Sequence, residues 1–206
     1  MVAMKSAIVL AGGLSRRLGG EKGLVLLGKQ TLVEHVYDRL RQVAGEVIIA
    51  TATKKQSKVY SKLLTGCVVT TDEESGGPLT GVWSALQRVS GEEVAIVGCD
   101  MPLISEKAMR LLFELCKEHD AAIPRWPNGY IEPLHAVYNT SSCIKATRKA
   151  LDAGRKDMRA MVLSLTNVRF VSTERMQRLG IPLTTFLNIN RAMDLKKARS
   201  LMEHGS

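Results

Sequence analysis

A glycine-rich, basic segment follows the first apolar run of the chain. Residues 8–22 read IVLAGGLSRRLGGEK, so Gly12 and Gly13 end the apolar run, and Arg17 and Lys22 follow soon after. Glycine lets a backbone come close to a phosphate, and arginine and lysine neutralise its charge. The segment contains neither a Walker A pattern nor Gly-x-Gly-x-x-Gly. It predicts a polyphosphate-binding loop, and an ordinary strand-to-helix turn on a basic protein is the alternative.

Acidic side chains follow two further apolar runs. The run at residues 93–98 (EVAIVG) leads into Asp100, and the run at residues 67–71 leads into Asp72. A carboxylate in such a place is a natural ligand of Mg²⁺, which takes one or two carboxylates together with phosphate oxygens. Asp100 is equally suited to cap a helix, and Asp72 to start a turn. The residues by themselves leave both a magnesium ligand and a helix cap open for Asp100.

Two asparagines alternate with apolar residues near the C-terminus, where residues 186–190 read FLNIN. On an extended segment Asn188 and Asn190 face the same side. Two amides on one face bind a polar ligand or tie down a neighbouring loop, and the sequence leaves both open. Another polar cluster, Glu132 to His135, precedes an apolar run, and we expect His135 to be structural rather than catalytic.

The elements that position these residues alternate between strand-like and helix-like patterns. Continuous apolar strands between helices indicate a mostly parallel sheet that is covered on both faces. In such sheets ligands bind beyond the carboxyl ends of the strands, where the glycine loop, Asp72 and Asp100 fall. The predicted strands are residues 6–12, 46–50, 67–71, 93–98, 121–124, 134–138 and 168–171. The predicted helices are residues 31–44, 54–64, 80–89, 105–118, 140–152, 157–164 and 192–202.

The bulk composition suits one globular domain. The 206 residues are 45% hydrophobic, so we predict a single α/β domain over residues 1–206. The net charge of +9 favours anionic partners, but only 4% of the residues are aromatic and no nucleic-acid motif is present, so nucleic acid is not an expected partner. No apolar run is long enough to span a membrane, and the N-terminal residues do not resemble a signal peptide. We expect a cytoplasmic protein.

Taken together, these segments resemble the molybdenum cofactor guanylyltransferase family, the MobA-like group of nucleotidyltransferases. The matching pieces are residues 10–19 with Lys22, GPLTG at 77–81, GCDMPL at 98–103 and NIN at 188–190. The resemblance implies a single Rossmann-like, three-layer domain of the kind found in nucleotide-diphospho-sugar transferases. It also implies transfer of GMP from GTP to molybdopterin that carries molybdenum, with release of pyrophosphate and formation of molybdopterin guanine dinucleotide.

The resemblance further assigns roles to individual residues. Arg17 and Lys22 would hold the triphosphate and Asp100 would bind Mg²⁺, and these three are the catalytic candidates. Asp72 would contact the guanosine part, and Asn188 and Asn190 would face the pterin side of the acceptor. The positions expected to bind the nucleotide are Leu10, Ala11, Gly12, Gly13, Lys22, Asp72 and Asp100.

The residues by themselves leave two other functions open. One is a related transferase that uses CTP or ATP, or a different phosphorylated acceptor. The other is a non-catalytic nucleotide sensor or an accessory protein of a molybdoenzyme, against which the presence of both Lys22 and Asp100 argues. Protein partners implied by the resemblance are other proteins of molybdenum cofactor biosynthesis and the molybdoenzymes that receive the cofactor.

Overall fold

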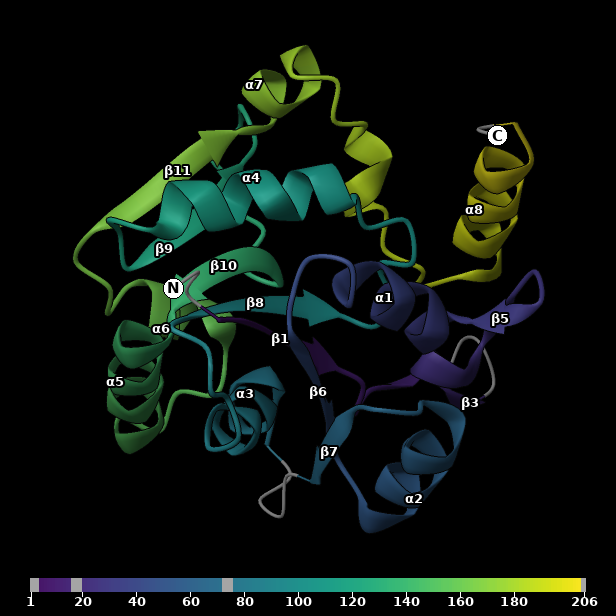
Figure 1. Cartoon of the computed structure of the whole chain (residues 1–206), viewed down its shortest axis with the longest axis horizontal. Helices are drawn as coiled ribbons and strands as arrows, with labels where there is room; N and C mark the ends of the chain where they lie inside the picture. The colour runs from purple at the N-terminus through teal and green to yellow at the C-terminus, as the bar shows by residue number, and fades with distance from the viewer. Residues whose placement is uncertain (1–3, 16–19, 72–75, 205–206) are drawn as a thin grey trace.

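A seven-stranded sheet forms the centre of the computed structural model, which describes residues 4–15, 20–71 and 76–204. The strand order is β11-β9-β10-β8-β1-β6-β7 (Figure 1). All neighbouring pairs are parallel except those that β10 makes with β8 and with β9. The strands are β1 (Lys5–Leu10), β6 (Glu46–Thr51), β7 (Val68–Thr71), β8 (Glu93–Gly98), β9 (Ala121–Arg125), β10 (His135–Asn139) and β11 (Val168–Ser172).

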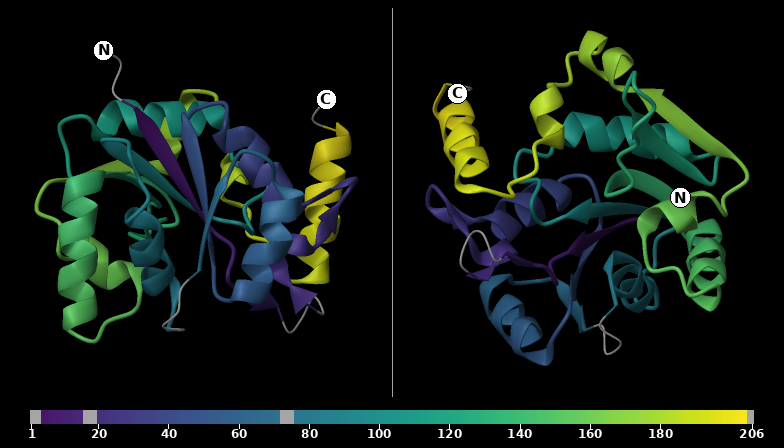
Figure 2. Two further views of the ribbon diagram at one scale, coloured as in Figure 1. Left: turned by 60° about the horizontal axis from the view of Figure 1, so that its bottom comes forward. Right: turned by 180° about the vertical axis from the view of Figure 1, so that it is seen from behind.

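Helices cover both faces of this sheet (Figures 1 and 2). One hydrophobic core lies between the sheet and α1, α2, α4 and α7, and a second lies between the sheet and α3, α5 and α6. Successive residues of a strand point into opposite cores, as Ile8 and Val9 do, which explains why the central strands are apolar throughout. The helices are α1 (Leu32–Leu40), α2 (Lys54–Leu63), α3 (Pro78–Leu86), α4 (Glu106–Cys116), α5 (Thr140–Asp152), α6 (Met158–Val162) and α7 (Thr173–Arg178).

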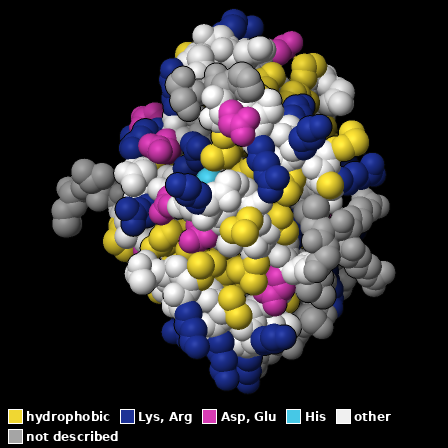
Figure 3. All heavy atoms as spheres, turned by 90° about the vertical axis from the view of Figure 1, so that its right-hand side faces the viewer, with side chains coloured by type: hydrophobic (Ala, Val, Ile, Leu, Met, Phe, Trp, Pro, Cys, Tyr) yellow, Lys and Arg dark blue, Asp and Glu magenta, His cyan; other side chains and the backbone are white. Residues whose placement is uncertain are grey.

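A smaller core joins the C-terminal helix α8 (Ala192–His204) to the N-terminal half of the chain. Leu27 and Leu32 come from the region of the hairpin β4–β5 (Leu26–Leu27 and Gln30–Thr31), and they pack with Ile189 and Ala198. Figures 1 and 2 show α8 beside this hairpin. On the face of the molecule that carries α8, Lys and Arg side chains lie in several separate groups, with acidic and hydrophobic side chains between them (Figure 3).

The predicted alternation of strands and helices is confirmed, and so is the mostly parallel, three-layer fold. β8 and α5 occupy the predicted ranges, and the other predicted elements differ by a few residues at their ends. The antiparallel strand is β10, because the chain turns back after β9 through residues 126–134 and pairs β10 directly with β9. Among the described residues no helix is long and apolar enough to cross a membrane.

Several short elements were not predicted, because they are too short to show a period. The hairpins β2–β3 (Leu14–Ser15 and Gly20–Glu21) and β4–β5 lie between β1 and α1. The helix α7 and the 3-10 helices η1 (Lys22–Leu24) and η2 (Leu183–Phe186) are further examples. The segment with Asn188 and Asn190 has no regular secondary structure.

Candidate active site

The carboxyl ends of β6, β1 and β8 are level with one another. Leu10 pairs with Ala50 of β6 on one side and with Gly98 of β8 on the other. Just beyond, the backbone N–H of Ala11 donates to Ala50 O over 2.8 Å, and that of Cys99 donates to Leu10 O over 3.1 Å. The glycine loop and the segment that carries Asp100 are therefore held side by side at this edge of the sheet. This agrees with the rule that ligands of such sheets bind beyond the carboxyl ends of the strands, which we call the strand-end rule.

The two glycines after β1 have different surroundings. A Cβ atom on Gly12 would lie 2.9 Å from Ala52 N, so a side chain there would push the loop after β6 away. A Cβ atom on Gly13 would meet no atom of the described residues within 4 Å. Gly12 is thus required by the close approach of two loops, whereas Gly13 faces open space that a ligand can enter.

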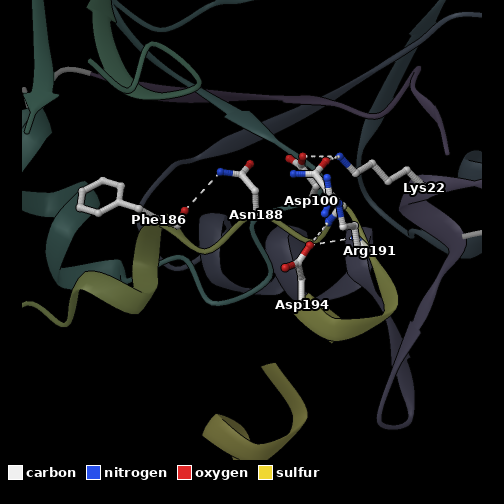
Figure 4. Close-up of polar contacts among 7 residues, drawn as sticks. Lys22, Asp100, Phe186, Asn188, Arg191 and Asp194 are labelled. Carbon is white, nitrogen blue, oxygen red and sulfur yellow. Dashed lines mark hydrogen bonds and ion pairs between the residues drawn. The ribbon is translucent and has the colours of Figure 1, made fainter. Parts of the chain in front are cut away.

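Lys22 connects the glycine loop to two distant segments. Its Nζ lies 2.5 Å from Asp100 Oδ2 and donates to Asn190 Oδ1 over 2.6 Å. The Lys22 and Asp100 side chains are only 17% and 18% exposed, so solvent screens the pair less than it would at the open surface. Gly98 contributes to this arrangement, because a Cβ atom there would collide with Asp100 Oδ1. Figure 4 shows the Lys22 ammonium and the Asp100 carboxylate meeting.

The segment with the two asparagines is fixed to the Asp100 loop and to α8. Ile189 N donates to Asp100 O over 2.8 Å, and Asp194 Oδ2 accepts hydrogen bonds from the backbone N–H groups of Asn190 and Arg191. Asn188 lies apart from the Lys22–Asp100 pair, and its Nδ2 donates to Phe186 O over 3.2 Å (Figure 4). The two predicted asparagines therefore have different contacts: Asn190 accepts a hydrogen bond from Lys22, whereas Asn188 bonds to the backbone of Phe186.

A cavity of about 450 Å³ opens beside these groups. Lys22 and Asp100 lie in its wall, and the other described residues of the wall are small or apolar, which suits a ligand with a charged part and a flat, less polar part. Gly77, at φ 119°, directly precedes α3, so a tight turn opens the helix at the cavity wall. The cavity is lined by Leu10, Gly12, Gly13, Lys22, Ala50, Thr51, Ala52, Gly76, Gly77, Pro78, Gly81, Gly98, Cys99, Asp100 and Leu134.

Three other titratable groups near the cavity, Cys99, Glu132 and His135, are buried, and burial favours the neutral form of each. Burial and the nearby Asp100 carboxylate raise the pKa of the Cys99 thiol to about 12. Burial also lowers the pKa of His135 to about 3, and its Nε2 lies 3.3 Å from Thr185 Oγ1, so His135 is a structural residue as predicted. Burial raises the pKa of Glu132, the indole N–H of Trp126 opposes this shift, and the Asp100 charge adds to it.

Most of the predicted site residues come together. Gly12, Gly13, Lys22 and Asp100 line the cavity together with Leu10. Ala11 does not line it: its side chain is fully buried in the core, and its backbone N–H is bonded to Ala50. Arg17 and Asp72 lie outside the described residues.

Sequence reasoning missed several residues that line the cavity. Ala50, Thr51 and Ala52 follow the same strand-end rule that singled out Asp100, so the rule could have identified them. Leu134 had no such signal, because its position depends on β10 entering the sheet antiparallel to β8.

The donor groups around Asp100 fit a magnesium ion that arrives with a phosphate ligand. Mg²⁺ prefers oxygen donors and usually takes one or two carboxylates, with phosphate and water oxygens completing its shell. Asp100 offers such a carboxylate, which forms an ion pair with one cation, the Lys22 ammonium, in this structure. The part of the chain that the structure describes has no group of three or more His, Cys, Asp or Glu side chains that could hold a metal without a substrate.

The fold and the cavity define an α/β protein with a nucleotide-sized site at its strand ends. The chain belongs to the MobA-like NTP transferase domain family, whose family model matches residues 7–168. It is 34% identical to a probable molybdenum cofactor guanylyltransferase of Methanosarcina mazei, over 94% of this chain and 89% of that protein. A protein with the same description from Pyrococcus horikoshii is 35% identical, over 92% of this chain and 96% of the relative.

Solved structures show the same fold. The crystal structure of molybdopterin-guanine dinucleotide biosynthesis protein A from Archaeoglobus fulgidus superposes with a TM-score of 0.81 at 28% identity, over 97% of this chain and 99% of that chain. The 4-diphosphocytidyl-2C-methyl-D-erythritol synthase of Anaerococcus prevotii has a TM-score of 0.76 at 14% identity, over 98% and 97% of the two chains, and shows the fold alone.

Proposed function

We propose that this protein transfers GMP from GTP to molybdopterin that carries molybdenum, releasing pyrophosphate and forming molybdopterin guanine dinucleotide. One observation carries the proposal: Lys22 and Asp100 form a largely buried charged pair in the wall of a nucleotide-sized cavity. Relatives that match this chain over almost its whole length are named as guanylyltransferases, which supports the choice of reaction.

The cavity wall supports one orientation of the nucleotide. Lys22 and Asp100 would lie along the triphosphate, with the N–H groups of the glycine loop as further donors. The small and apolar surfaces of Ala50, Pro78 and Gly81 would lie against the base and ribose. We also propose Arg17 as a second cation at the triphosphate and Asp72 as a contact of the guanosine part.

The reaction that we propose is an in-line displacement. A terminal phosphate oxygen of the acceptor forms a bond to the α-phosphorus of GTP, the bond from that phosphorus to the bridging β-phosphate oxygen breaks, and pyrophosphate leaves with the negative charge. An acceptor phosphate that is already ionised needs no strong base, so positioning and charge neutralisation do most of the work. The uncharged His135 and Cys99 are accordingly given no role in proton transfer.

Lys22 has two roles in this proposal. Without a nucleotide its ammonium neutralises Asp100, and with one it holds the phosphates that become pyrophosphate. We propose that Asp100 then holds Mg²⁺, which when bound would withdraw charge from the phosphate oxygens. Asn190 would keep the Lys22 ammonium oriented, and Asn190 and Asn188 would face the acceptor.

Calorimetry with Mg-GTP, Mg-CTP and Mg-ATP, followed by a pyrophosphate-release assay with the acceptor, tests the proposal. We expect the protein to bind Mg-GTP tightly and Mg-CTP and Mg-ATP weakly. We also expect pyrophosphate release to require molybdopterin loaded with molybdenum. A preference for CTP or ATP would instead indicate a transferase of different specificity. GTP binding without pyrophosphate release would indicate a nucleotide sensor.

The remaining expectations concern the setting of the reaction. We propose that the protein works in the cytoplasm as a single domain, with GTP and molybdopterin as its small-molecule substrates. Proteins of molybdenum cofactor biosynthesis or molybdoenzymes would deliver the acceptor or receive the product. Cell fractionation, and affinity capture in the presence of the product, would test these points.

A further inference from the structure

A second cavity lies next to the nucleotide cavity, and the proposed reaction steps do not use it. It measures about 490 Å³ and is lined by Asn128, Gly129, Tyr130, Ile131, Pro133 and Arg159. Leu134, which follows Pro133 in the chain, lines the nucleotide cavity. The short segment from Ile131 to Leu134 therefore separates the two cavities.

The turn between β9 and β10 forms one wall of this second cavity and is held by hydrogen bonds. Gly129 N donates to Trp126 O over 2.9 Å, Trp126 N donates to Tyr130 O over 2.8 Å, and Tyr130 N donates to Asn128 Oδ1 over 3.0 Å. Gly129 has a φ of 84°, a left-handed conformation that suits glycine. Below the turn, the Trp126 indole donates to the buried Glu132 over 2.8 Å. This turn presents Tyr130 with 62% of its surface exposed.

Arg159 also lines this cavity. It lies on α6, where its neighbours Met158, Ala160 and Met161 are buried, so packing holds the helix while Arg159 is exposed. Within the part of the chain that the structure describes, the Arg159 guanidinium forms no hydrogen bond or ion pair, whereas that of Arg155 pairs with Asp157. Among the described residues, no acidic side chain lines this cavity.

An exposed tyrosine ring and a guanidinium that face one cavity suit a flat, electron-rich ring system. Both groups stack on planar heterocycles, and the guanidinium N–H groups also donate to ring oxygens and nitrogens. Ile131 and Pro133 add apolar wall, and the exposed Asn128 amide adds one more polar group. The lining thus matches a heteroaromatic ring better than an isolated phosphate.

We propose that this second cavity binds the pterin ring of the acceptor while the acceptor phosphate reaches Asp100. The inference rests on the proposed function and adds a site for the part of the acceptor that does not react. The nucleotide fills the first cavity, so the body of the acceptor must lie outside it, and the second cavity is separated from it by one short segment of chain. Tyr130 and Arg159 are positioning residues for the acceptor.

Fluorescence titration with pterin-6-carboxylate, a planar and anionic probe, tests the cavity without catalysis. We expect the Kd of the probe to rise about tenfold in Tyr130→Ala and in Arg159→Ala, because each change removes one stacking partner. Tyr130→Phe keeps the ring and should bind as the unchanged protein does. Arg178→Ala, which removes an exposed arginine of α7, is the matched control and should have no effect. Equal affinity in all variants, or no binding to the unchanged protein, overturns the proposal.

Steady-state kinetics then separates this inference from the proposed function. We expect Tyr130→Ala and Arg159→Ala to raise the KM for the molybdopterin acceptor about tenfold, with kcat and the Kd of Mg-GTP nearly unchanged. A parallel fall in GTP affinity would indicate a structural effect and would contradict the proposal. If the unchanged protein transfers GMP but the acceptor KM of both variants equals that of Arg178→Ala, this inference alone fails. If the unchanged protein transfers no GMP, the proposed function fails, and the probe titration still decides whether the cavity binds a pterin.

Discussion

Asn190 Oδ1 accepts a hydrogen bond of 2.6 Å from Lys22 Nζ, although 168 positions separate the two residues in the chain. The same ammonium lies 2.5 Å from Asp100, so one lysine joins the glycine loop, the end of β8 and the segment before α8. The packing of α8 on the β4–β5 hairpin supports this contact, because Ile189 is buried in the small core that they share. The C-terminal helix thus helps to complete the site.

Removal of the Lys22 ammonium should impair turnover far more than stability. We expect Lys22→Ala to lower kcat about 100-fold or more, which is the usual effect of losing one group that stabilises transition-state charge. The Tm should change little, because the side chain is part of a site rather than of a core. Pyrophosphate release and thermal unfolding measure the two effects.

Lys29→Ala is the matched control for this prediction. Lys29 is an exposed lysine close to Lys22 in the chain and does not line the nucleotide cavity. Full activity in Lys29→Ala, with loss in Lys22→Ala, would show that position rather than total charge matters. An unimpaired Lys22→Ala enzyme would refute the role that we assign to this residue.

Asp100→Asn should remove the dependence of GTP binding on Mg²⁺. The amide has nearly the same shape but lacks the charge that attracts the ion. Calorimetry should show that Mg²⁺ strengthens GTP binding to the unchanged protein and has little effect on the variant. Asp152→Asn is the control, because Asp152 is an exposed residue whose pair with Arg148 lies on the surface of α5. A variant that still binds Mg-GTP more tightly than GTP in EDTA would exclude Asp100 as the metal ligand.

The two glycines after β1 should respond differently to the same substitution. Gly12→Ala should lower both the Tm and the affinity for GTP, because the new methyl group would lie against Ala52. Gly13→Ala should leave the Tm unchanged, since a methyl group has space there, and should lower only GTP affinity by blocking the approach of the phosphates. Thermal unfolding and calorimetry on both variants make the comparison. Normal GTP binding by Gly13→Ala would mean that the phosphates do not approach this residue.

Burial of His135 should make the protein less stable as the pH falls from 7 to 5. The pKa of His135 is about 3 in the folded protein and about 6.5 in an unfolded chain, so the unfolded state binds more protons in this range. Stability is therefore present above pH 6.5 and is lost as the pH falls below that value. The expected loss at pH 5 is about 2 kcal/mol.

Urea unfolding at pH 7 and pH 5 measures this loss in the unchanged protein and in His135→Gln. Other titrating groups are common to both proteins, so the difference between the two pH dependences isolates His135. If the variant does not fold, imidazole NMR signals of the unchanged protein decide the point, and they should show His135 neutral at pH 5. A His135 signal that titrates near pH 6.5 would contradict the prediction.

The strands and the main helices could be predicted because their signals are local. The apolar run of β8 and the helical spacing of α5 lie within single short stretches of sequence, and both elements occupy their predicted ranges. The same holds for the strand ends, since the sequence alone assigns the glycine loop with Lys22, and Asp100, to one edge of a parallel sheet. The short α7 could not be found in this way, because six residues do not reveal a helical period.

The sequence by itself determined the fold class, the glycine loop and the presence of Lys22 and Asp100 at neighbouring strand ends. Only the tertiary structure decided that Lys22 lies between Asp100 and Asn190, that Asn188 lies apart from them, and that Ala11 faces the core rather than the cavity. It also decided that the segment from Ile131 to Leu134 lies between the nucleotide cavity and the second cavity beside Tyr130. Periodicity acts along the chain, whereas the contacts of Lys22 depend on how segments far apart in the sequence pack together, 78 positions away for Asp100 and 168 for Asn190, and no local pattern encodes that packing.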